Sequence, residues 1–394
     1  MALMVQARKS PAQIPPPSGE VGRGYVGNVA DPPSPSPSRG EGGLPPALAW
    51  VDRAPFFQAG LAGYSDAAMR LIARRHGAPY CITEAMLDMF LINGGKGLKQ
   101  AELDDEDHPI AGQLMGSHPA DIAAGAKVLL SLGYDVIDIN LACPVKKIKR
   151  KCRGGHLLSV PDEAIDIIKA VRDAVGDDAP LTIKLRRAYD ETPEAEASIQ
   201  QIFEAVIAHG FAAATVHGRT VQQKYDGPSK WPKLKTIVDR YQSVQRSANA
   251  VEGDPGLPPG ASDSPLLIFG SGDIFSPQAI FEMIEQTGVR AVSVARGCIG
   301  DPWVFRAAHQ IMRGEPVVEP TIDEQRDVLA EHFELSVKLH GEQQAGRMMR
   351  KFGIKFSRHH PRAEAVKDAF IKVKSLAGWR AVLDEFYGTT AVGA

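Results

Sequence analysis

The feature that most constrains the fold of this chain is a repeated alternation of short apolar runs with stretches that can form helices. Each run is five or six residues long and apolar on both faces, and enough residues for a helix separate it from the next. Such runs are typical of parallel strands that are covered by helices. The candidate strands are residues 56–60, 80–84, 110–114, 135–140, 181–185, 212–217, 266–270 and 291–295.

Eight such units over about 250 residues predict an α/β fold of the closed (β/α)8 barrel type, the TIM barrel. The clearest helical stretches are residues 120–132 and 161–175, each with apolar residues three or four positions apart. An open doubly wound sheet is the alternative, but no Gly-x-Gly-x-x-Gly motif follows the first strand to bind a dinucleotide there. From Asp323 onward the pattern is helical, which predicts a smaller all-helical C-terminal domain.

Two segments rich in proline, glycine and serine interrupt the pattern. Residues 1–50 hold too few apolar side chains to offset the entropy of ordering, so we expect a disordered tail. A second such segment, at about 242–265, predicts a flexible insertion within one domain. The expected domains are therefore a barrel at 51–318 and a helical domain at 319–394.

The composition excludes several classes of protein. The net charge is −2, so any nucleic-acid surface must be a local patch. The four cysteines (81, 143, 152 and 298) form no Cys-x-x-Cys pair, which argues against a metal site and against a disulfide scaffold. No secretory signal and no run of about 18 apolar residues are present, so we expect a cytoplasmic monomer with no membrane partner.

Polar side chains gather where the apolar runs stop. In a closed barrel of this type, the chemistry collects at the C-terminal ends of the strands, so these side chains should share one mouth. The set comprises Glu84, Gln113, Asn140, Cys143, Lys184, Arg186, His217, Ser271, Gly272, Asp273, Arg296 and Gly297. Any barrel places some polar residues there, so their joint occurrence is more informative than any single one.

Cys143 lies three residues past the fourth predicted strand, in the segment Asn-Leu-Ala-Cys-Pro-Val-Lys-Lys-Ile. Taken alone, a cysteine is most often a small buried apolar residue. Here Pro144 forces a turn after the thiol, and six Lys or Arg residues follow between positions 146 and 153. Because a basic run lowers the pKa of a thiol and attracts phosphates, this context favours a functional Cys143.

Glycine-rich loops follow the last two predicted strands. They are Phe269-Gly-Ser-Gly-Asp-Ile274 and Val294-Ala-Arg-Gly297. In barrels of this type, these two loops commonly bind phosphate through backbone N–H groups. The pair therefore predicts a phosphorylated ligand.

Together these segments resemble the tRNA-dihydrouridine synthase family over about residues 54–385. Residues 140–148 resemble the family's Asn-x-x-Cys-Pro catalytic loop, and the C-terminal helices resemble its RNA-binding domain. Residues 113–116, 182–186 and 216–220 resemble its flavin-contacting segments, and residues 272–274, 296–297 and 301–305 resemble its phosphate end.

The resemblance implies an FMN-dependent reduction of the C5–C6 double bond of uridines in tRNA, with NADPH as the reductant. Cys143 would be the proton donor, provided that a closed pocket counters the effect of the basic loop on its pKa. FMN would be held by Gln113, Lys184, His217, Ser271, Gly272, Asp273, Ala295 and Arg296. A flipped-out uridine and its RNA would be bound by Asn140, Arg186, Lys146, Lys147 and Arg150. Further RNA contacts are expected from Arg347, Arg350, Lys351, Lys355, Arg358 and Arg362 of the helical domain.

Three positions depart from the family pattern. Gly60-Leu61 follows Ala59 where the family has Pro-Met, Ser271 replaces an Asn, and Ala295 replaces a Gly. These changes keep open an RNA-binding protein that has lost catalysis. A second alternative is an FMN barrel reductase of a small molecule, although such a substrate needs neither the basic loop nor the helical tail.

Overall fold

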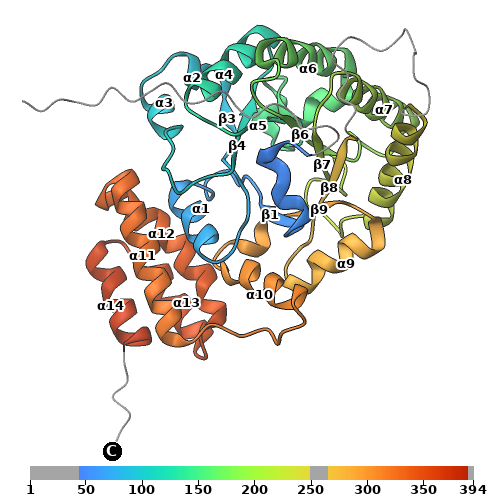
Figure 1. Ribbon diagram of the computed structural model, residues 1–394. Coiled ribbons are helices and arrows are strands. Elements are labelled where there is room, and N and C mark those ends of the chain that lie inside the picture. Colours follow the sequence, from blue (N-terminus) through green and yellow to red (C-terminus); the bar gives the residue numbers. More distant parts are fainter. Residues whose placement is uncertain (1–43, 249–264, 389–394) are drawn as a thin grey trace, which may run out of the picture. The chain divides into compact units, whose positions relative to one another are not determined.

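The computed structural model describes residues 44–248 and 265–388. Their nine parallel strands form one sheet, which the pairing of β2 with β4 closes into a barrel (Figure 1). The two-residue strand β3 pairs with β4 and lies outside the ring. The strands are β1 (Phe56–Gln58), β2 (Cys81–Ile82), β3 (Met86–Leu87), β4 (Ile110–Met115), β5 (Val136–Asn140), β6 (Leu181–Arg186), β7 (Ala213–His217), β8 (Leu267–Ser271) and β9 (Ala291–Val294). The predicted eight-stranded barrel is confirmed, and β3 is an addition to it.

Helices surround the ring of strands (Figure 1). In the barrel they are η1 (Pro46–Asp52), α1 (Ala67–Arg75), α2 (Asp88–Ile92), α3 (Lys96–Gln100), α4 (Pro119–Ser131), α5 (Lys146–Lys149), η2 (Gly154–Ser159), α6 (Pro161–Val175), α7 (Pro193–Ala208), α8 (Trp231–Ala248), α9 (Pro277–Thr287), η3 (Arg296–Cys298) and α10 (Trp303–Met312). The C-terminal helices are α11 (Ile322–His340), α12 (Glu342–Phe356), η4 (Ser357–His359), α13 (Ala363–Lys372) and α14 (Leu376–Tyr387). The predicted helical C-terminal region is confirmed.

Several barrel helices begin where the sequence carries a proline. Helices α4, α6, α7 and α9 all start with this residue, whose missing N–H costs nothing in the first turn. Thr192 and Ser276 precede two of them, and each side chain accepts a hydrogen bond from a backbone N–H of the first turn. The two helices predicted at residues 120–132 and 161–175 agree closely with α4 and α6, which both begin at such a proline.

The interior of the barrel changes from apolar to polar along each strand. Alternate residues point inward, and the first inward positions form an apolar cluster with Phe57, Ala111, Val136 and Phe269 among its members. Two residues further along β4, β5, β7, β8 and β9, the inward positions are occupied by Gln113, Asp138, Thr215, Ser271 and Ser293, and Thr182 is the first inward residue of β6. The strands therefore deliver polar side chains to one end of a barrel that is sealed at the other.

The sealed end is covered by η1, in which Trp50 is buried. Its ring stacks on Tyr80 with centroids 4.9 Å apart, and Phe57 meets it edge-on at 5.3 Å. The sequence predicts a disordered tail as far as residue 50, whereas the structure orders residues 44–50 against the barrel. Residues 44–50 show no helical periodicity, so their sequence gives no local sign of order. They become ordered because strands distant in the sequence form the barrel end that buries them. The remainder of the predicted tail, residues 1–43, lies outside the described residues.

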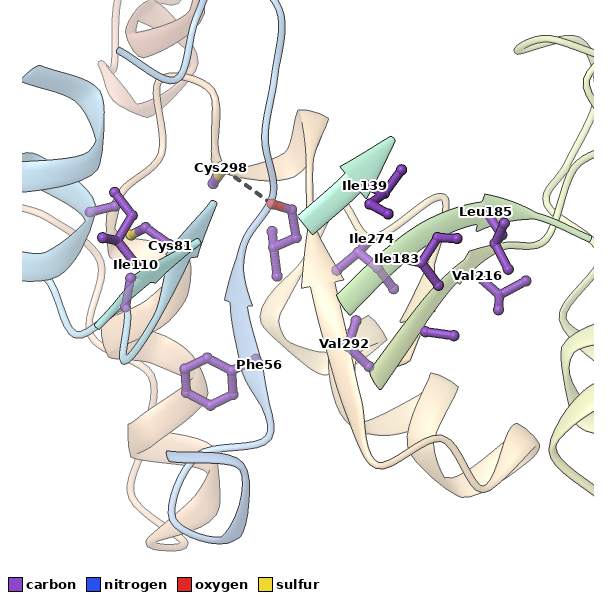
Figure 2. Packing of buried hydrophobic residues seen from close by; sticks show 14 of the residues in the cluster. Phe56, Cys81, Ile110, Ile139, Ile183, Leu185, Val216, Ile274, Val292 and Cys298 are labelled. Carbon is purple, nitrogen blue, oxygen red and sulfur yellow. Dashed lines mark hydrogen bonds between the residues drawn. The ribbon is translucent and has the colours of Figure 1, made fainter. Parts of the chain in front are cut away.

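A second cluster packs the outer face of the strands against the helices. Figure 2 shows members of this cluster from neighbouring strands, among them Ile139, Ile183 and Val216. Cys81 and Cys298 belong to the same cluster, and the Cys298 thiol donates to the Val294 carbonyl oxygen at 3.5 Å. Burial raises the pKa of Cys81 to about 11, as expected for a core cysteine.

The C-terminal helices pack against the barrel through side chains of α1 and of the loop after β9. His340 Nε2 lies 2.9 Å from the Asp66 carboxylate, and Arg358 pairs with Asp301 at 2.9 Å. Gly300 has φ +68°, and a Cβ there would lie 2.6 Å from Lys355, so a larger residue would separate the two parts.

The predicted insertion at about 242–265 begins later than the sequence indicates. Helix α8 continues to Ala248, so residues 242–248 of the predicted insertion are helical, and residues 249–264 lie outside the described residues.

Within the described residues, no helix combines the length and apolar character that crossing a membrane requires.

Replacing Trp50 with alanine should lower the free energy of unfolding by about 3–5 kcal/mol, because it empties a buried aromatic site at the closed end of the barrel. Urea unfolding measures this change. Val318→Ala is the matched control, since Val318 is 55% exposed, and it should change stability by about 0.5 kcal/mol or less. An equally small effect at Trp50 would show that η1 does not contribute to the core.

Candidate active site at the barrel mouth

A pocket of about 170 Å³ opens at the carboxyl ends of the strands. The sequence-predicted residues that line it are Gln113, Asn140, Cys143, Lys184, Arg186, His217, Ser271, Gly272, Asp273, Ala295 and Arg296. Lys146 and Lys147 belong to α5 but their side chains are not described, and Arg150 is exposed just after that helix.

The Cys143 loop closes on itself through a pair of glycines. Gly155 N donates to the Cys143 carbonyl oxygen at 3.0 Å. Gly154 has φ +57°, and a Cβ there would lie 3.0 Å from the Cys143 Cβ. The chain that leaves Cys143 through the basic segment can return to it only because these two positions carry no side chain.

The Cys143 thiol lies partly buried between this loop and β6. Burial raises its pKa, while the backbone N–H of Val145 and the charge of Arg186 lower it by less. The thiol is therefore protonated at neutral pH, as a proton donor has to be. Among the described residues, the positive charge that lowers the pKa of this thiol comes from Arg186 on β6, whereas the sequence predicts such an effect from the basic loop.

Arg186 fills the space between the Cys143 loop and β7. Its Nε donates to the Ala142 carbonyl oxygen at 2.9 Å, and its Nη1 donates to the Thr220 carbonyl oxygen at 2.8 Å. The guanidinium packs 5.4 Å from the centroid of the Tyr225 ring. Arg186 thus fixes the backbone on both sides and brings a positive charge close to the thiol.

A chain of hydrogen bonds crosses three strands beneath the pocket. Thr182 Oγ1 donates to Asp138 Oδ1 at 2.6 Å, and Gln113 Nε2 donates to Asp138 Oδ2 at 2.7 Å. Asn140 Nδ2 in turn donates to Gln113 Oε1 at 2.7 Å. Asn140 Oδ1 accepts the backbone N–H of Ala142 at 3.0 Å, so the network ends one residue before Cys143.

Lys184 is a buried cation that lines the pocket. Its ammonium nitrogen is buried and makes no hydrogen bond within the described residues. Burial lowers its pKa to about 8, even though the charge of Asp138 acts in the opposite direction. The Ser293 hydroxyl, which also lines the pocket, is buried without a partner too. Unpaired buried polar groups are costly, so both atoms suit a polar ligand that carries acceptors.

His217 is a neutral hydrogen-bond donor at the end of β7. Burial lowers its pKa to about 2, with Lys184 and Arg186 acting in the same direction. Its Nδ1 lies 3.2 Å from the backbone N–H of Arg219, which donates to it, so the ring proton is assigned to Nε2. A Cβ at Gly272 would lie 3.2 Å from this nitrogen, so the glycine keeps the donor accessible.

The loop after β8 organises two arginines around Asp273. Its carboxylate accepts from Arg219 at 2.7 Å, from the backbone N–H of Ser229 at 2.7 Å and from Arg296 at 3.1 Å. Through its side chain, Asp273 therefore holds Arg296 at the rim of the pocket. The Arg296 guanidinium lies between the rings of Tyr225 and Phe275, at 5.2 and 5.1 Å. This end of the pocket is suited to an anionic group.

Two of the cations expected to contact RNA are used within the protein. Arg358 donates to the Gly297 carbonyl oxygen at 3.0 Å, next to Arg296, and the Lys351 ammonium lies 4.2 Å from the centroid of the Tyr64 ring. Arg347 and Arg350 are exposed on α12.

Sequence reasoning missed Asp138 and Thr182 beneath the pocket and the glycine pair beside Cys143. A signal was available for the first two, because they precede Asn140 and Lys184 by two positions and share their inward face.

In the described residues, no cluster of three or more His, Cys, Asp or Glu side chains could hold a metal ion.

Comparison with known proteins gives consistent matches over most of the chain. A profile of the family described as dihydrouridine synthase matches residues 57–250 and 261–389. The chain is 32% identical over 295 residues to tRNA-dihydrouridine synthase B of Pseudomonas aeruginosa, covering 74% of this chain and 80% of that protein. It is 28% identical over 333 residues to tRNA-dihydrouridine synthase B of Vibrio cholerae, covering 84% and 95% of the two chains. It is likewise 28% identical over 334 residues to probable tRNA-dihydrouridine synthase 1 of a Synechocystis strain, covering 84% and 86%.

Alkylation by iodoacetamide should report the raised pKa of Cys143. Because only the thiolate reacts, the rate at this residue should rise with pH along a curve whose midpoint lies above that of free cysteine. Peptide mass spectrometry separates Cys143 from the exposed Cys152, and Cys143→Ala identifies its signal. A midpoint at or below that of free cysteine would mean that Arg186 and the basic loop outweigh burial.

Proposed function

The chain belongs to the dihydrouridine synthase family, as its sequence motifs predicted, and from this premise we propose that it reduces uridines of tRNA to dihydrouridine with FMN in the barrel-mouth pocket. NADPH would be the reductant. The observation that carries the proposal is that the partly buried Cys143 lines the same pocket as Lys184, whose buried ammonium makes no hydrogen bond within the described residues.

The pocket residues fit a flavin that carries a phosphate. Lys184 offers an unpaired cation, and His217 offers a neutral donor beside Gly272. Gln113 would contribute its remaining amide hydrogen and lone pair, while Arg296, Ala295 and the Ser271–Asp273 loop would hold the phosphate. These contacts are what a negatively charged, acceptor-rich cofactor requires.

Gly60, which stands where the family has a proline, is explained by its neighbours in this chain. A Cβ at this position would lie 2.2 Å from the Thr83 carbonyl oxygen. The local packing therefore requires glycine here, and the departure from the family pattern follows from this packing. It does not support the alternative of a protein that has lost catalysis.

The chemistry needs a hydride for C6 of the uracil and a proton for C5. FMN held by these residues would supply the hydride when reduced. Cys143 supplies the proton, and burial of the thiol keeps that proton in place until the base has entered. The resulting thiolate would be stabilised by the nearby charge of Arg186 and by the backbone N–H of Val145.

Asn140 is the residue best placed to orient the uracil. Its Oδ1 and one of its amide hydrogens are committed to Ala142 and Gln113, which leaves one N–H for a carbonyl oxygen of the base. The base must leave its stack to reach this pocket, at a cost of a few kcal/mol that phosphate contacts offset. Arg347 and Arg350 on α12 and the basic loop after Cys143 would provide those contacts.

The visible spectrum of the purified protein tests the flavin, and Cys143→Ala tests the proton donor. We expect flavin bands that bleach when NADPH is added without oxygen, in the wild type and in Cys143→Ala alike. The variant should lose at least about 100-fold in dihydrouridine formation on unmodified tRNA, the usual contribution of a general acid. Bleaching without product in the wild type would point to another substrate, whereas near-normal turnover in Cys143→Ala would assign the proton to another group.

Charge reversal on α12 tests the RNA surface. Arg347→Glu with Arg350→Glu should weaken tRNA binding and reduce its dependence on salt concentration, since each lost phosphate contact lowers the slope by about 1. Flavin reduction by NADPH should be unaffected. Lys367→Glu on α13 is the comparison variant, because Lys367 already pairs with Glu364 at 3.1 Å. Equal effects at the two sites would indicate a general charge effect.

A further inference from the structure

Asp138 lies at the centre of the polar layer beneath the pocket. It is fully buried, and the strand register places Gln113 on one side of it and Thr182 on the other. The inward residue two positions earlier on the same strand is the apolar Val136. A buried carboxylate is costly unless its neighbours need its charge or its acceptors, so this position calls for a specific explanation.

The first consequence of this carboxylate is the orientation of two carboxamides. Burial raises the pKa of Asp138, while the hydrogen bonds from Thr182 and Gln113 and the charge of Lys184 act against that rise. The carboxylate accepts from both neighbours, so Gln113 turns its Nε2 toward Asp138. Its Oε1 therefore faces Asn140, whose amide nitrogen donates to it and whose own oxygen faces the Ala142 N–H. The orientations of both side chains at the pocket floor thus follow from Asp138.

The second consequence is electrostatic. Lys184 lies on the strand next to Asp138, and the other charged or titratable groups that face it are Arg186 on β6 and His217 on β7. Neither supplies a negative charge, so Asp138 is the acid that opposes the burial of the Lys184 ammonium.

We propose that Asp138 is a positioning residue of the flavin site, whose carboxylate orients Gln113 and Asn140 and supplies the counter-charge that keeps Lys184 protonated. The inference rests on the proposed function for the identity of the ligand, but the electrostatic coupling between Asp138 and Lys184 can be tested without it. Asp138 touches neither substrate nor cofactor in this scheme and acts through the three side chains.

Two variants separate the two roles. Asp138→Asn removes the charge, but its amide can still accept from Gln113 and donate to Thr182 after the hydroxyl rotates, so the orientation survives. Asp138→Val removes charge and acceptors together. FMN affinity is measured by quenching of flavin fluorescence on protein freed of flavin, between pH 6 and pH 9.

In the wild type, affinity should fall as the pH rises through the pKa of Lys184, about 8, because the cation is charged only below it. In Asp138→Asn the fall should move to lower pH, since the carboxylate no longer raises that pKa. In Asp138→Val affinity should fall by a further factor of about ten at every pH. An unchanged midpoint in Asp138→Asn overturns the counter-charge, and equal affinities of the two variants overturn the orienting role.

A flavin-free measurement distinguishes failure of this inference from failure of the proposed function. Urea unfolding is compared for the wild type, Asp138→Asn, Lys184→Gln and the double variant. If the two charges pair, Asp138→Asn lowers the unfolding midpoint in the wild type but much less, or not at all, when Lys184 is absent. Equal losses in both backgrounds, including failure to fold in both, overturn the pairing whether or not FMN binds.

Discussion

The closed ring of parallel strands is the constraint on which the rest of this protein depends. Because side chains alternate along a strand, every second residue of each strand points into the barrel interior. Inward residues near the start of a strand, such as Phe57 and Val136, form an apolar core, and those near its end carry polar groups. The position of a residue along its strand therefore decides whether it stabilises the fold or reaches the pocket.

The pocket concentrates positive charge. Lys184, Arg186 and Arg296 line it, and the neutral His217 adds a donor but no charge. Such a site favours anionic ligands and stabilises a thiolate after proton transfer. The Cys143 thiol stays protonated in these surroundings because burial outweighs the neighbouring charges. Burial and cationic surroundings thus oppose each other at this thiol, and the balance between them determines whether Cys143 can serve as an acid.

The C-terminal helices contact the loop beside the pocket, although none of their described residues lines the pocket itself. Arg358 of η4 donates to the Gly297 carbonyl oxygen and pairs with Asp301, one on each side of the loop that follows Arg296. The close approach at Gly300 brings the two parts together at the same loop. The C-terminal helices therefore brace the anion end of the pocket, which explains why Arg358, predicted from the sequence to contact RNA, is used within the protein.

The sequence by itself determined the barrel, the helical tail and the residues at the strand ends, because these follow from periodicities of two and three to four residues and from helix-start signals. It also led to Cys143, through a thiol, a proline and a basic run that are adjacent in the chain. Only the tertiary structure decided that Asp138 is buried near Lys184, that the Cys143 loop returns past Gly154 and Gly155, and that Trp50 closes the barrel. Each of these depends on contacts between residues that lie apart in the sequence, as do the two ends of the Cys143 loop. Local pattern carries no information on such contacts, since burial and hydrogen-bond partners exist only once the ring has closed.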